Sequence, residues 1–214
     1  MRAAYCYLVL LAPSLLCAEI IDRIAVTVGN QVITESRVRE EIRLTAFLDE
    51  VEPAYSVAER RAAAGRLVEQ ALIRSEIRAG QFAPPAATEA DGMVAEFTQE
   101  HFKSKEAYQR ALKKYDLTER DVQRHFLRQL ATLRFIDLRF RPAVEVTDAE
   151  MWDYYRYKLV PRWQEAGERA HPFDEVRGEV GEILKQERVD RALDAWILEM
   201  RTRVRIEYKE EAFR

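Results

Sequence analysis

The chain has 214 residues, of which 48% are apolar and 33% charged, a composition typical of a globular protein with a sizeable core. Its 34 basic and 37 acidic side chains give a formal net charge of -3 and are interspersed along the sequence. This pattern lacks the basic patch that nucleic-acid binding requires, so we expect no nucleic-acid partner. The length suits one domain or two small ones.

The N-terminal segment differs from the rest of the chain. Arg2 precedes a short apolar run that extends to Leu16, and Glu19 then opens a charged sequence. Because this order is typical of a signal peptide, we expect residues 1–18 to be removed after Ala18 and the mature chain to be released into the periplasm. The run is too short to span a bilayer and nothing comparable follows it, which predicts no integral membrane span.

Both cysteines of the chain, Cys6 and Cys17, lie in this segment. Cleavage after Ala18 leaves the mature chain without a thiol, which excludes disulfides, thiol catalysis and cysteine-ligated metals. The alternative is a lipoprotein, cut before Cys17 and acylated on it. Such sites have a small residue before the cysteine, whereas Leu16 is large.

The segment after the signal peptide reads as two strands that lead into a helix. Residues 20–28 are rich in β-branched side chains, Gly29-Asn30 supplies a tight turn, and residues 31–33 continue as a second strand. Thr34 is a candidate helix N-cap, because apolar residues recur at helical spacing behind it. We therefore expect a hairpin followed directly by a helix.

The middle of the chain predicts an array of helices. A hydroxyl residue with an acid three positions later can satisfy the free amides of a first helical turn. This pattern predicts four helix starts, at Ser56, Thr88, Thr118 and Thr147. The helix after Ser56 should end near Ala79 and the helix after Thr118 near Phe140, with a shorter helix over residues 104–114.

The helix that begins at Thr147 is unusually aromatic. Trp152 and Tyr155 fall on one row of this helix, and Met151 and Tyr154 fall on the next row. Because so many large side chains cannot share one stripe, we expect one row to face the core and the other a cleft. Core packing is the favoured environment for most of them.

The C-terminal part is expected to close the fold. Residues 161–171 are polar and irregular, and apolar residues then keep helical spacing as far as Met200. Residues 204–208 alternate apolar and charged side chains, which predicts a strand that pairs with the N-terminal hairpin, since so few short strands cannot bury themselves alone. The predicted fold is mainly α with a small β element, in a single domain over residues 19–214. This domain is expected to contain an N-terminal part over residues 19–160, a short loop over 161–171, and a C-terminal helix and strand over 172–209.

No catalytic, metal or cofactor site emerges from the residue pattern. His101, His125 and His171 are far apart and have no second ligand at metal-binding spacing, although His125 is expected to be partly buried beside Phe126. None of the seven glycines forms a phosphate-binding loop, and no serine stands in a nucleophile elbow. We therefore expect no cofactor and no enzymatic activity.

Residues 21–36, IDRIAVTVGNQVITES, resemble the N-terminal start of the SurA-like periplasmic chaperones. The likeness continues at residues 146–155, VTDAEMWDYY, and resumes at residues 172–177, PFDEVR, before residues 196–198 and the strand over 204–208. The order of these motifs is more specific than any one of them. The resemblance covers nearly all of the mature chain.

The resemblance has two departures. The turn reads Gly29-Asn30, where the family has Asn first. Relatives commonly carry a parvulin prolyl isomerase domain in the middle, with an Ala-x-His-Ile opening and a Gly-Gly-Asp-Leu-Gly stretch, and neither occurs here. Only residues 161–171 occupy that gap, whereas an independent domain needs roughly fifty residues. The resemblance therefore implies a chaperone module without its isomerase.

The function that this resemblance implies is ATP-independent binding of unfolded exported polypeptides, outer-membrane proteins in particular. Aromatic and methionine side chains on a concave helical surface can form apolar contacts with many different client sequences, so the binding would have low sequence specificity. The candidate contact residues are Phe47, Tyr55, Met93, Phe97, Phe102, Tyr108, Met151, Tyr154 and Tyr157.

Two other functions stay open at this point: a peptidyl-prolyl isomerase, and an interaction subunit for one folded partner. A monomer and a strand-swapped homodimer are both compatible with the sequence.

Overall fold

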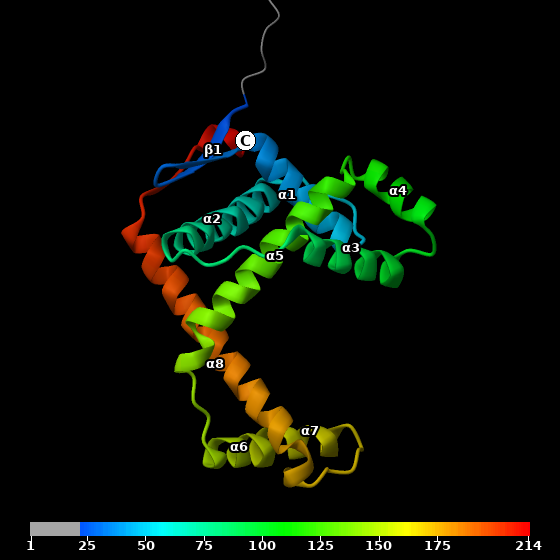
Figure 1. Ribbon diagram of the computed structural model, residues 1–214, viewed down its shortest axis with the longest axis vertical. Helices are drawn as coiled ribbons and strands as arrows, with labels where there is room; N and C mark the ends of the chain where they lie inside the picture. Colours follow the sequence, from blue (N-terminus) through cyan, green and yellow to red (C-terminus); the bar gives the residue numbers. More distant parts are fainter. Residues whose placement is uncertain (1–21) are drawn as a thin grey trace, which may run out of the picture.

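The computed structural model describes residues 22–214; the expected signal peptide and Cys17 lie outside the described residues. The described part is mainly helical and contains one three-stranded antiparallel sheet, which confirms the predicted fold class. Figure 1 shows a body formed by the sheet and helices α1 to α5, from which α8 extends as an arm to α6 and α7. No helix in residues 22–214 is long and apolar enough to cross a membrane.

The predicted hairpin is confirmed. Strands β1 (Ile24–Val28) and β2 (Gln31–Thr34) pair antiparallel and are joined at Gly29 and Asn30. Gly29 has a φ of 58°, a left-handed conformation that glycine adopts without the steric penalty of a Cβ. The turn therefore uses glycine where the backbone requires it.

The predicted pairing of the chain ends is also confirmed. Strand β3 (Ile206–Tyr208) pairs antiparallel with β1, giving the strand order β2-β1-β3. Backbone hydrogen bonds flank this pairing on both sides, from the Gly29 amide to the Arg205 carbonyl at 2.9 Å and from the Lys209 amide to the Ala25 carbonyl at 2.8 Å. Residues 178 to 182 positions apart in the sequence are thereby paired in one sheet.

Helices α1 (Glu35–Leu48) and α2 (Val57–Ala79) pack against the sheet and against each other. The Thr34 hydroxyl accepts a hydrogen bond from the Arg37 amide at 3.4 Å, and the Ser56 hydroxyl accepts one from the Glu59 amide at 3.2 Å. Both predicted N-caps are therefore confirmed.

Helix α3 (Ala87–His101) begins one residue earlier than its predicted N-cap, Thr88. The carboxylate of Glu89 accepts a hydrogen bond from the Ala86 amide at 2.8 Å, so the acid alone caps the helix and Thr88 lies inside the first turn. The predicted N-cap at Thr88 was wrong, because the prediction assumed a hydroxyl residue at the N-cap position, whereas Ala86 occupies it.

Helix α4 (Lys105–Lys114) matches the short helix predicted over residues 104–114 and is capped by Ser104, and helix α5 (Glu119–Arg139) begins at the predicted N-cap Thr118. At the start of α5 the capping is reciprocal, since the Asp121 carboxylate accepts from the Thr118 amide at 2.8 Å and the Thr118 hydroxyl accepts from the Asp121 amide. A short 3₁₀ turn over Arg141–Ala143 follows α5.

The predicted N-cap at Thr147 is confirmed, with reciprocal capping by Glu150, but the helix behind it continues farther than predicted. Helix α6 (Asp148–Tyr154) continues through a π-helical turn, Tyr155–Leu159, into α7 (Val160–Glu165). In the π turn the Val160 amide donates to the Tyr155 carbonyl five residues earlier, and this wider turn lets the chain pass Pro161 without breaking. The loop predicted over 161–171 is thus confined to residues after Glu165.

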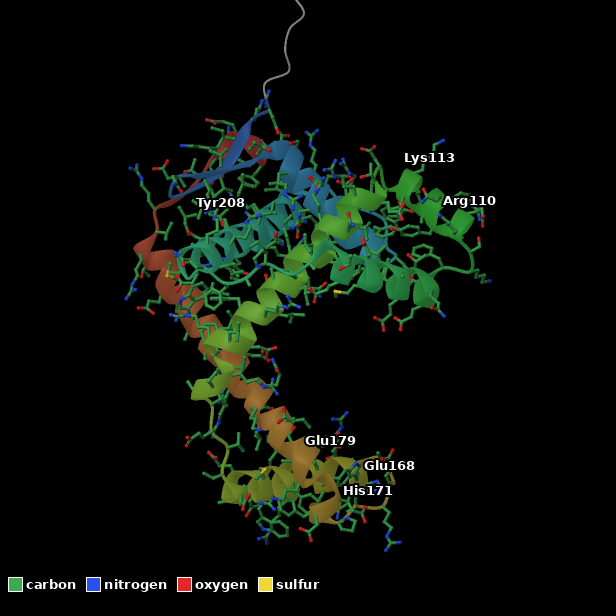
Figure 2. The ribbon with its side chains drawn as sticks, in the orientation of Figure 1. Arg110, Lys113, Glu168, His171, Glu179 and Tyr208 are labelled. Carbon is green, nitrogen blue, oxygen red and sulfur yellow. The ribbon has the colours of Figure 1, made fainter. Side chains whose placement is uncertain are left out.

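Helix α8 (Phe173–Arg203) is about 45 Å long and links the two ends of the molecule. Figure 2 shows Glu168, His171 and Glu179 at the end of the arm farthest from Tyr208 in β3. A final 3₁₀ turn, Glu210–Ala212, packs beside β1.

Three groups of buried apolar side chains within residues 22–214 hold the body together and join it to α8. The first joins the sheet to α1 and α2, and the second joins α1 to α3, α4 and α5. The third lies where α2, α5 and α8 meet and contains Phe135, Phe140 and Trp196, whose rings are 5.6 to 6.1 Å apart. This third group fixes the arm to the body.

The C-terminal residues form part of the first group. Phe213 is only 1% exposed, and the Arg61 guanidinium lies 5.5 Å from the centre of its ring. We expect Phe213→Ala to lower the free energy of unfolding by about 3 to 5 kcal/mol, because it removes a buried ring and leaves a cavity. Urea denaturation measures the change. Deletion of residues after Arg203, which also removes β3, should cost more.

The matched control is Arg214→Ala, which changes an exposed neighbour whose backbone carbonyl, not its side chain, accepts a hydrogen bond from Arg60. Equal urea midpoints for the two variants would contradict the inclusion of Phe213 in the core.

Candidate functional site

An aromatic cluster occupies the space between α1, α3, α4 and the start of α5. Phe47 of α1 is 1% exposed and lies at its centre. The rings of Phe97, Phe102, Tyr108 and Tyr115 lie 5.6 to 6.2 Å from the Phe47 ring. These are normal distances for packed aromatic pairs, so the cluster is a rigid support for the helices around it.

A surface cavity of about 900 Å³ opens above this cluster, between α3, α4 and the first turns of α5. One face of α3 and its C-cap form one wall of the cavity. The residues of this wall recur at helical spacing: Asp91, Val94, Ala95, Thr98, Gln99 and Phe102. Ser104, Lys105 and Tyr108 come from α4 and its cap, and Glu119, Arg120 and Gln123 come from α5.

Several polar groups at the rim of this cavity are engaged within the fold. The Asp91 carboxylate accepts a hydrogen bond from Gln123, and the Ser104 hydroxyl accepts one from the Ala107 amide at 3.2 Å. The Thr98 hydroxyl donates to the Val94 carbonyl at 2.7 Å. The rim thus presents no pair of nucleophile and base, and its floor is apolar.

Tyr108 is the one buried polar side chain of the cavity wall. Its hydroxyl has no hydrogen-bond partner among residues 22–214. Burial, together with the negative charge of Glu119, raises the pKa of the Tyr108 phenol to about 12, so the hydroxyl stays protonated at neutral pH. A bound molecule that offers a carbonyl would satisfy it.

A second aromatic group lies at the far end of the arm, in a distal unit made of residues 148–181. Trp152 stacks on Tyr155 at 5.5 Å, and Phe173 meets both rings edge-on at 4.8 and 5.3 Å. The Tyr155 hydroxyl donates to the His171 carbonyl at 2.7 Å, which holds the irregular segment against the helix. Trp152 and Tyr157 remain 46% and 64% exposed.

The structure divides the nine predicted contact residues between these two places. Five belong to the aromatic cluster and its rim: Phe47, Met93, Phe97, Phe102 and Tyr108. Three lie on the distal unit: Met151, Tyr154 and Tyr157. Tyr55, which is 40% exposed, stands apart in the loop between α1 and α2.

Of the first five, only Phe102 and Tyr108 line the cavity, and Phe47 is wholly buried beneath it. Phe47 therefore supports the surface and does not form it. Sequence reasoning missed Thr98, Gln99 and Gln123, although the spacing from Asp91 to Phe102 along α3 was a usable signal for a single helix face.

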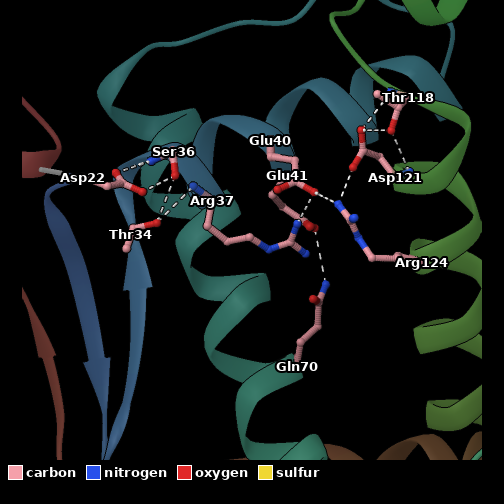
Figure 3. Close-up of polar contacts among 10 residues, drawn as sticks. All are labelled: Asp22, Thr34, Ser36, Arg37, Glu40, Glu41, Gln70, Thr118, Asp121 and Arg124. Atoms are coloured by element: carbon pink, nitrogen blue, oxygen red, sulfur yellow. Dashed lines mark hydrogen bonds and ion pairs between the residues drawn. The ribbon is translucent and has the colours of Figure 1, made fainter. Parts of the chain in front are cut away.

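A polar layer lies between α1, α2 and α5 (Figure 3). Its centre is Glu41, which is 3% exposed and accepts hydrogen bonds from Arg66 and Gln70, each at 3.4 Å. Glu40 pairs with Arg37 at 2.5 Å and with Arg124 at 3.5 Å. These contacts hold three helices in register without contributing a catalytic group.

His125 lies at the edge of this layer, half-buried beside Phe126 as predicted, with the two ring centres 5.6 Å apart. Burial, reinforced by the positive charges of Arg128 and Arg37, lowers the pKa of His125 to about 4. The imidazole is therefore neutral at physiological pH.

The remaining histidines each face one acid. His101 Nδ1 lies 2.9 Å from a carboxylate oxygen of Glu50, and His171 Nδ1 lies 3.9 Å from one of Glu175, a pair that the sequence did not predict. Within residues 22–214, no group of three or more His, Cys, Asp or Glu side chains is arranged to hold a metal ion. Neither a protein-family model nor a curated protein matches this chain.

The lowered pKa of His125 makes stability depend on pH. Between pH 6.5 and pH 4 the unfolded chain binds a proton that the folded chain does not, so the contribution of His125 is present above pH 6.5 and is lost as the pH falls. We expect a loss of about 3 kcal/mol across this window. Urea denaturation at a series of pH values should show a shallower decline for His125→Gln than for wild type.

The control is His171→Gln, which removes an exposed imidazole and should retain the full decline. Parallel pH profiles for wild type and His125→Gln would contradict the burial of a neutral imidazole at this place.

Proposed function

We propose that this chain is an ATP-independent periplasmic chaperone that binds unfolded exported polypeptides, related to the SurA-like family but without a prolyl isomerase domain. The observation that carries the proposal is the cavity between α3, α4 and α5. Its volume of about 900 Å³ lies within the roughly 300–1,000 Å³ range of ligand pockets, and its floor is apolar. A short unfolded segment is a ligand of suitable size and chemistry.

The chemistry of the rim favours binding over catalysis. The Ser104 hydroxyl caps α4 and the Asp91 carboxylate pairs with Gln123, so neither group is set up for catalysis. An apolar floor with few polar contacts can accept a peptide without demanding one sequence. The irregular segment between α7 and α8 is short, starting after Glu165 and ending before Phe173, which leaves no room for an isomerase domain of roughly fifty residues.

The distal unit adds a second apolar contact region. Trp152 and Tyr157 are 46% and 64% exposed at the end of a helix about 45 Å long. Two separated contact regions on one chain raise the affinity for a flexible client that reaches both, because the second contact becomes intramolecular. This arrangement favours long unfolded chains over short peptides.

The direct test is the aggregation of an unfolded outer-membrane β-barrel protein diluted from urea, followed by light scattering. We expect the mature chain to slow aggregation at equimolar ratio without ATP. Ala95→Glu, which places a charge on the exposed α3 wall of the cavity, should weaken this effect several-fold, because a bound client would bury the new carboxylate without a partner.

Ala58→Glu makes the same change at an exposed position of α2, away from the cavity, and should act like wild type. Unslowed aggregation with the wild-type chain would contradict the proposed function. Acceleration of X-Pro isomerisation in a proline peptide would instead favour the isomerase.

The contribution of the distal unit is tested with Tyr157→Ser. Because the ring is 64% exposed, we expect the thermal midpoint to stay unchanged while the affinity for an unfolded client falls, measured by fluorescence anisotropy. Leu198→Ser is the matched control, since Leu198 is 67% exposed on α8 outside the distal unit. Equal affinities for these two variants would exclude the distal unit from client binding.

A further inference from the structure

A second, smaller cavity of about 240 Å³ lies between α2, α5 and the segment that joins α2 to α3. Its walls are largely apolar and come from Ile77, Pro84, Pro85, Leu127 and Ala131. The volume is below the range for drug-sized ligands and is suited to one large side chain.

Three arginines also line this cavity. Arg78 of α2 is exposed, and the other two are Arg74 of α2 and Arg128 of α5. Both are partly buried, and neither forms an ion pair or a side-chain hydrogen bond within residues 22–214. Their neighbours Arg66 and Arg124 are paired, with Glu41 and with Glu40. Arg74 and Arg128 thus line the cavity without a counterion among residues 22–214.

The surroundings of Arg74 and Arg128 destabilise the charged form of both guanidinium groups. Burial and then the nearby charge of Arg37 lower the pKa of Arg74, and the same causes lower the pKa of Arg128 to about 10. The attraction of Glu41 and Glu40 opposes this effect at Arg128 without cancelling it. An anion bound between the two guanidinium groups would relieve their repulsion.

The ligand that fits must join an anion to an apolar group. A carboxylate suits arginine because it accepts two parallel hydrogen bonds from one guanidinium. An aspartate or glutamate side chain supplies the charge without an apolar part. The C-terminal residue of a polypeptide carries both, with its carboxylate one bond from the atom that bears its side chain.

We propose that this cavity binds the free C-terminus of a client polypeptide whose last residue is apolar, with the carboxylate between Arg74 and Arg128 and the side chain against Ile77, Leu127 and Pro85. This inference rests on the proposed function and names part of its substrate class. It adds a specific contact to the sequence-tolerant cavity between α3, α4 and α5.

The test uses the mature chain and one fluorescently labelled unfolded peptide that ends in Phe, made with a free carboxylate or with a C-terminal amide. By fluorescence anisotropy we expect the free acid to bind about tenfold more tightly, the factor that one charge-assisted hydrogen bond supplies. Arg74→Gln and Arg128→Gln should each abolish this preference. Arg110→Gln, at an exposed position of α4, should retain it.

Equal binding of the acid and the amide by the wild-type chain would overturn this inference and leave the proposed function standing. Failure of the chain to bind either peptide would count against the proposed function itself. Hexanoate is the probe for a small free acid. If hexanoate competes with the free-acid peptide and binds with a dissociation constant equal to that of the peptide, a small carboxylic acid is the occupant. The polypeptide assignment is then overturned.

Discussion

Strand β1 forms antiparallel hydrogen bonds with β2 on one edge and with β3 on the other, so Val26 lies opposite both Ile33 and Tyr208. Without β3, the hairpin would be a two-stranded unit of marginal stability. With it, Val26 and Val28 become almost fully buried against α1 and α2. The fold therefore depends on a contact between its two chain ends, which forms late in any synthesis from the N-terminus.

This contact also positions everything that lies along α8. The helix leaves β3 at a fixed point, passes the aromatic group around Trp196, and carries the distal unit at its other end. The body separately holds the cavity between α3, α4 and α5 on its own aromatic support. The molecule thus carries one concave region and one exposed aromatic region at opposite ends of its helical scaffold (Figure 1).

Local signals predicted much of this fold. The turn at Gly29, the N-caps at Thr34, Ser56 and Thr118, and the alternating terminal strand all depend on short-range physics that one sequence contains. The start of α3 and the helix through Pro161 were missed, because a glutamate alone can cap a helix and a π turn can accommodate a proline.

The candidate site was less predictable, since burial is a tertiary property. Phe47 and Phe102 look alike in sequence, yet one is the centre of a core and the other lines a cavity. Arg74 and Arg66 are likewise indistinguishable until the position of Glu41 shows which of them has a partner.

The most direct measurement is site-specific photo-crosslinking to an unfolded client, with the crosslinker at Gln99 or at Gln109. Both side chains are exposed, but Gln99 lines the cavity between α3, α4 and α5, whereas Gln109 does not. We expect a client crosslink from position 99 and little from position 109. Equal crosslinking from both positions, or crosslinking from position 109 alone, would contradict it.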